Sequence, residues 1–109
     1  MIYNASENKK EAVKAGVTPH TLQELKGKDI KVTNIVVSTK TNEDTGEIIN
    51  VCSVKVGNEY YSSISKSVFD SVQTIINFYE PSEIVSGIDL VVDSGKSKNN
   101  REFLYLNIK

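Results

Sequence analysis

Three aromatic side chains in strand-like segments have the positions expected of a nucleic-acid contact surface. Tyr61, Phe103 and Tyr105 each alternate with the residues that we assign to the core face of their strands. Because successive side chains of a strand point to opposite faces, we expect these three rings to face outward. Outward rings beside cations suit single-stranded nucleic acid, since the rings stack on bases and the cations meet phosphates. The alternative is that the helix or the N-terminal residues cover the rings as a second small core.

The charge of the chain is unevenly distributed, although its formal net charge is only −1. Residues 26–40 and 94–109 each carry four Lys or Arg against one Asp or Glu, whereas residues 59–93 carry six Asp or Glu against one Lys. A small net charge argues against holding duplex DNA by bulk positive charge, so any nucleic-acid contact must be local. The predicted phosphate contacts are Lys31, Lys55, Lys96, Lys98 and Arg101. A charged surface that serves only solubility is the alternative.

Catalytic chemistry has little support in the sequence. His20 is the only histidine and Cys52 the only cysteine, and no sequence feature pairs His20 with Cys52 or with a particular serine as nucleophilic catalysis would require. One Cys and one His cannot form a structural zinc site, and the six glycines form no phosphate-binding loop. We therefore expect no enzyme activity, no metal and no cofactor, with Cys52 as a small buried hydrophobic residue.

The order of the predicted elements indicates the fold. Ser65–Tyr79 has the apolar spacing of a helix, which Glu80–Ser82 is expected to end. The predicted strands are 29–39, 48–56, 59–64, 87–93 and 102–108. Three strands, a helix and two strands predict a mostly β, five-stranded Greek-key OB-fold barrel whose helix plugs one end. A β-bulge is expected between Thr33 and Asn34, because the apolar face of the first strand changes there.

The N-terminal residues are expected to lie outside the barrel. Residues 1–17 hold too little apolar surface for a core of their own, so we expect a flexible or partly helical arm before a single domain, 18–109. Thr18 and Pro19 are suited to begin a short helix that ends at Gly27. No apolar run has the length of a membrane span and the first residues are too polar for a secretory signal, so we expect a cytoplasmic protein.

A turn at Thr45–Glu47, the run Tyr60–Ser65 before the helix and the passage Lys96–Leu104 accompany this strand order. Over residues 25–108 the chain thereby resembles the small OB-fold single-stranded DNA-binding proteins of bacteriophages and mobile elements. The resemblance implies a binding groove across the second and third strands, flanked by the loops 40–47 and 94–101. Bacterial single-strand binding proteins end in an acidic tail that recruits partners. This chain ends within its last strand, so recruitment by such a tail is not expected.

The sequence therefore predicts a non-catalytic protein that coats single-stranded DNA with little sequence preference, in phage or plasmid DNA replication or recombination. Single-stranded DNA is the expected partner, while RNA and a second copy of the chain, as a homo-oligomer, are left open. The alternative is a protein-binding module, or an inhibitor of a host protein, that uses the same barrel surface. The salt dependence of oligonucleotide binding separates the two, because phosphate contacts impose a steep slope.

Overall fold

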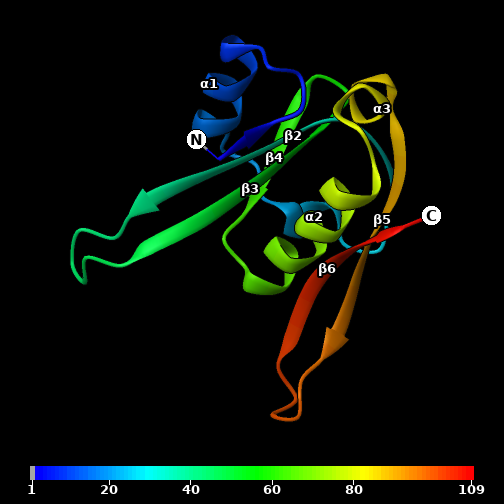
Figure 1. The fold of residues 1–109 in the computed structure, drawn as a ribbon. Coiled ribbons are helices and arrows are strands. Elements are labelled where there is room, and N and C mark those ends of the chain that lie inside the picture. Colours follow the sequence, from blue (N-terminus) through cyan, green and yellow to red (C-terminus); the bar gives the residue numbers. More distant parts are fainter. Residues whose placement is uncertain (1) are drawn as a thin grey trace.

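One long central strand organises the sheet in the computed structural model, which describes residues 2–109. The elements are β1 (Tyr3–Asn4), α1 (Lys9–Val17), the 3-10 helix η1 (Leu22–Leu25), β2 (Asp29–Thr41), β3 (Ile48–Val56), β4 (Glu59–Ser63), α2 (Lys66–Phe78), α3 (Pro81–Ser86), β5 (Ile88–Lys96) and β6 (Glu102–Ile108). The main strands are antiparallel in the order β4-β3-β2-β5-β6, and β1 pairs with β2. With α1, α2 and α3 packed around this sheet, the described chain is a mixed α/β fold (Figure 1).

The predicted bulge in β2 is confirmed. The pairing of β2 with β3 shifts register between Val32 and Asn34. Before the shift the even-numbered residues Ile30 and Val32 face the core. After it the odd-numbered residues Ile35 and Val37 do. The bulge therefore lets one strand serve both halves of the sheet, because the start of β2 pairs with β5 and its later part pairs with β3.

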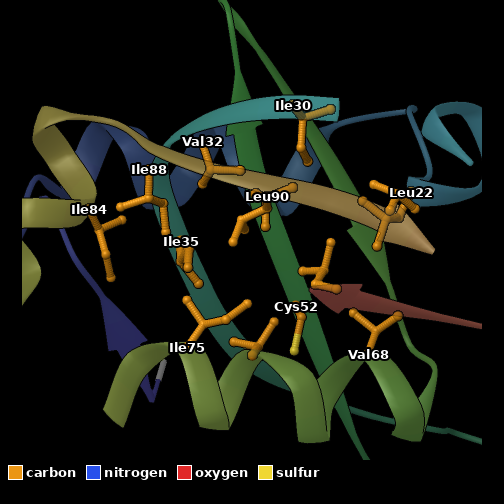
Figure 2. Packing of buried hydrophobic residues seen from close by; sticks show 14 of the residues in the cluster. Leu22, Ile30, Val32, Ile35, Cys52, Val68, Ile75, Ile84, Ile88 and Leu90 are labelled. Atoms are coloured by element: carbon orange, nitrogen blue, oxygen red, sulfur yellow. The ribbon is translucent and has the colours of Figure 1, made fainter. Parts of the chain in front are cut away.

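Helix α2 closes the core from one side, as the sequence predicts. Its residues Val68, Val72 and Ile75 are at most 1% exposed and recur at helical spacing. Figure 2 shows Val68 and Ile75 pointing from the helix toward the strands. The predicted partners from the last two strands, Leu90, Leu104 and Leu106, belong to the same cluster.

The predicted closed barrel does not form, because β4 and β6 are not paired with each other in the described chain. The edge of β6 bonds to α2 instead: Ser67 Oγ donates to the Leu104 carbonyl at 2.6 Å, and the Leu106 N–H donates to Ser71 Oγ at 3.1 Å. The edge of β4 bonds to the segment before η1, where the Ser62 N–H donates to the His20 carbonyl at 3.2 Å. Backbone groups at both edges thus find hydrogen-bond partners outside the sheet, and the sheet stays open between β4 and β6.

Two helix boundaries differ from the prediction. Thr18 and Pro19 precede the short helix instead of beginning it, and Thr21 is its N-cap, with its N–H donating to Glu24 Oε2 at 2.7 Å. Pro81 opens a further helix, α3, instead of only ending α2, and the side chain of Glu83 accepts the Glu80 N–H at 3.0 Å. Proline is well suited to such a first helical position, because it has no N–H to leave unpaired.

The N-terminal residues pack on the outer face of β2, β3 and β4. Ala15 of α1 forms a second buried cluster with Val36 and Tyr60, and Tyr60 is only 2% exposed. The predicted faces of β4 are therefore wrong: Tyr60 lies under α1, whereas Tyr61 packs partly against the main core and Ile64 is exposed. The division into an arm, 1–17, and a domain, 18–109, stays a prediction.

Replacing Ser67 and Ser71 together by Ala should lower the free energy of unfolding by about 1 to 3 kcal/mol, because the Leu106 N–H would lose its partner beside the core. Urea denaturation measures the change. Ser86→Ala is the matched control, since the exposed Ser86 hydroxyl donates to the Ser82 carbonyl within the same helix. Equal stability of the double variant and the parent would contradict the bridging role of the two serines.

Candidate nucleic-acid interface

The hairpin of β5 and β6 presents two outward aromatic rings, of which Phe103 is exposed and Tyr105 half-buried. Phe103 and Tyr105 point outward from β6, while Leu104 and Leu106 between and beyond them are buried. The two ring centroids lie 5.9 Å apart with the planes inclined at 38°. Phe103 is 38% exposed, and Tyr105 is half-buried but lies outside the core, so the predicted outward side of the strand is confirmed for both rings and full exposure only for Phe103.

Gly95 makes room for the Phe103 ring. It lies opposite Phe103 in the register of β5 and β6. A Cβ atom at position 95 would lie 2.8 Å from Cζ of the ring, closer than van der Waals contact allows. The ring therefore rests against the bare backbone of the neighbouring strand, which fixes its orientation on the surface.

The loop at the tip of the same hairpin carries the predicted cations. Ser97 closes it, since its N–H donates to the Arg101 carbonyl and its own carbonyl accepts the Asn100 N–H, both at 2.9 Å. Lys98 and Arg101 are exposed on this loop, and Lys96 lies at its base opposite Glu102. Lys96, Lys98 and Arg101 thus lie on the hairpin that bears the two rings. Figure 1 shows this hairpin of β5 and β6 projecting from the rest of the fold. We call Lys96–Tyr105 the hairpin site.

Two other predicted cations are already paired and lie on other parts of the sheet. Lys31 Nζ lies 3.3 Å from Asp89 Oδ1, where β2 meets β5. Lys55 Nζ donates to Glu11 Oε1 at 2.5 Å, under the N-terminal helix. A phosphate would have to replace a carboxylate at each of these positions.

Glu11 centres a network that sequence reasoning missed. Besides the bond from Lys55, it accepts one from Tyr60 Oη at 3.0 Å, and Tyr60 Oη in turn accepts one from Asn34 Nδ2 at 2.8 Å. The bond from Lys55 holds the pKa of Glu11 below its ordinary value, and burial raises the pKa of Tyr60 to about 12. Helix α1 therefore covers part of the face of β3 and β4 that the resemblance implies as a groove.

Tyr61 is not brought to the ring pair. It is half-buried, packs partly against the main core and lies beside the His20 ring, with centroids 5.3 Å apart. A groove between the end of β4 and the start of β6 separates Tyr61 from Phe103.

A groove of about 600 Å³ separates the end of β4 from the start of β6. Its lining comes from three segments, which are Thr21–Gln23, Ser62–Ser65 and Glu102–Leu104. We call it the seam groove, because it lies where a closed barrel would pair these two strands. The sequence gives no direct signal for it, since its walls are far apart in the chain and its existence depends on the unpaired edges.

The side chains of metal-ligating type and the single cysteine show no arrangement for catalysis within residues 2–109. They contain no group of three or more His, Cys, Asp or Glu placed to hold a metal ion. Cys52 is buried, and burial raises the pKa of its thiol to about 11, so it carries little thiolate at neutral pH. Nor does any helix in this part of the chain have the length and apolar character to cross a membrane.

Glu11→Gln should lower the melting temperature at neutral pH, and this difference from the parent should vanish in acid. A folded-state pKa held below 4.5 stabilises the folded protein above pH 4.5, and that contribution is lost as the pH falls through the folded pKa. Thermal melts of both proteins across this pH range measure the change. Glu43→Gln, in the exposed turn, is the control. A difference independent of pH would contradict the role given to the Glu11 charge.

Comparison with known proteins identifies the family of this chain. A family model described as phage single-stranded DNA-binding protein matches residues 1–109. Neither a curated protein nor a solved structure gives a match.

Proposed function

This chain belongs to the phage single-stranded DNA-binding protein family, and we propose that it holds the strand on the hairpin site. Phe103 and Tyr105 stack on bases, while Lys96, Lys98 and Arg101 contact phosphates. Family membership places the protein among non-enzymatic DNA-binding proteins. We infer that it coats the strand in phage DNA replication or recombination, in the cytoplasm.

The outward ring pair is the observation that carries this proposal. The two rings lie 5.9 Å apart, and the more exposed one, Phe103, rests on Gly95, so together they offer a surface on which a base can stack. Stacking tolerates any sequence, because every base has an aromatic face. We therefore propose binding with little sequence preference.

Lys31, Lys55 and Tyr61 stay predictions as contacts of a longer DNA segment. The first two already have carboxylate partners, Asp89 and Glu11, so each contact with a phosphate would cost an existing ion pair. For this reason we assign the main contribution to the hairpin site.

We also infer that the sheet is an OB-fold opened along one side. Its strand order and the place of α2 between β4 and β5 support this inference, because a five-stranded OB barrel requires that order. Oligo(U) titrated beside oligo(dT) tests RNA as a partner, and sedimentation with and without DNA tests a homo-oligomer.

Phe103→Ala and Tyr105→Ala should each weaken oligo(dT) binding by about 1 to 3 kcal/mol, because each removes a stacking surface. The free energy of unfolding should change by less than about 1 kcal/mol, since both rings lie outside the core. Fluorescence anisotropy and urea denaturation measure the two quantities.

Phe78→Ala is the matched control for the ring substitutions. Phe78 is also an exposed phenylalanine, 67% accessible, but it lies at the end of α2. It should bind oligo(dT) like the parent. Equal affinity of the parent, Phe103→Ala and Tyr105→Ala would overturn the hairpin site as the stacking surface.

Changing Lys96, Lys98 and Arg101 together to Ala should flatten the dependence of log affinity on log salt by about 2 units, since each phosphate contact on a single strand contributes about 0.7. The control removes the same charge elsewhere, at the exposed residues Lys9, Lys10 and Lys66. It should leave the slope nearly unchanged. Identical slopes for the two triple variants would show that only net charge matters.

A further inference from the structure

The seam groove adjoins the hairpin site and is a hollow that the function assigned so far does not use. Phe103 lines both the groove and the hairpin site. Its volume of about 600 Å³ lies within the range of small-molecule sites, roughly 300 to 1,000 Å³. A nucleotide stacked near Phe103 would therefore have an open space beside it.

The lining of the seam groove matches the chemistry of a nucleobase. Ile64 and Phe103 are the exposed apolar residues of its lining, and such surface suits the faces of a base. Gln23, Ser63 and Ser65 supply amide and hydroxyl groups, which both donate and accept hydrogen bonds and so suit the edge of any base.

The charge at the β6 end of the groove suits a phosphate. Lys26 forms an ion pair with Glu102, which lines the groove. Lys96 lies opposite Glu102 in the register of β5 and β6. Glu102 is therefore paired with Lys26 and has a second cation, Lys96, on the neighbouring strand, so a phosphate arriving there would compete with Glu102 for Lys26.

We propose that the seam groove takes one nucleotide of the bound strand, with its base between β4 and β6 and its phosphate replacing Glu102 as the partner of Lys26. This inference rests on the proposed function, because it extends the path of the strand beyond Phe103. It adds Lys26 and Gln23 to the DNA contacts and gives Glu102 the role of a carboxylate that the phosphate displaces.

Cysteine protection tests whether DNA occupies the groove. Gln23→Cys and Ile64→Cys place a thiol at exposed positions in two different segments of the lining, and Asn77→Cys places one on the solvent side of α2 as the control. The parent gives the background from the buried Cys52. With saturating oligo(dT), both groove thiols should react with a maleimide at close to this background rate. The Asn77→Cys thiol should react as fast as without DNA.

Charge exchange tests the phosphate contact. Glu102→Gln should bind oligo(dT) several-fold more tightly at low salt and show a salt slope steeper by about 0.7, whereas Lys26→Gln should bind more weakly with a flatter slope. Asp29→Asn is the control, since Asp29 is paired with Lys109 on an exposed part of the sheet. An equal gain for Asp29→Asn would reduce the effect to net charge and overturn the proposed exchange.

The two proposals fail in different ways. Groove thiols that stay fully reactive while oligo(dT) binds, with binding still lost in Phe103→Ala, would overturn the seam inference and leave the hairpin site intact. Unchanged binding by Phe103→Ala and Tyr105→Ala would instead overturn the hairpin site. Protection of both groove thiols together with a gain for Glu102→Gln supports the seam inference.

Discussion

The need to satisfy the backbone edge of β6 shapes the rest of this protein. In a closed barrel β4 would meet that need, but here the hydroxyls of Ser67 and Ser71 do so from α2. Because α2 also buries Val72 in the core, the helix and the strand edge are held in one arrangement. The hairpin of β5 and β6 is then free to project beyond the core, and the seam groove stays open. The hairpin site and the seam groove, the two proposed DNA contacts, both depend on β6 bonding to α2 and not to β4.

The distribution of ion pairs explains how a chain with a net charge of −1 can bind an anion. Lys31, Lys55 and Lys26 each have a carboxylate partner, so much of the positive charge is neutralised within the molecule. Among the described residues, Lys98 and Arg101 have no such partner and stand at the hairpin tip. The unpaired positive charge is therefore concentrated beside the rings, where the proposed phosphate contacts would also orient the strand.

The spacing of residues along the chain predicted the features that depend on sequence neighbours. It missed the features that depend on contacts between residues far apart in the chain. The helix over Lys66–Phe78, the bulge of β2 and the outward rings follow from spacing, because each is decided within a few residues. The faces of β4 could not be predicted in this way. Tyr60 is buried because Glu11 and Asn34, far away in the chain, supply partners for its hydroxyl. The open seam likewise depends on serines of α2 that spacing assigns only to a polar helix face.

Photocrosslinking tests the central claim, that the strand lies on the hairpin site, most directly. An oligo(dT) carrying 5-iododeoxyuridine is bound to the intact protein, irradiated and digested, and the attached residues are identified by mass spectrometry. Stacking on the hairpin predicts attachment at Phe103 and Tyr105, because the iodinated base reacts with the aromatic ring that it contacts. Attachment confined to Phe78 or Tyr79 of the α2 end, with none in β6, would contradict it.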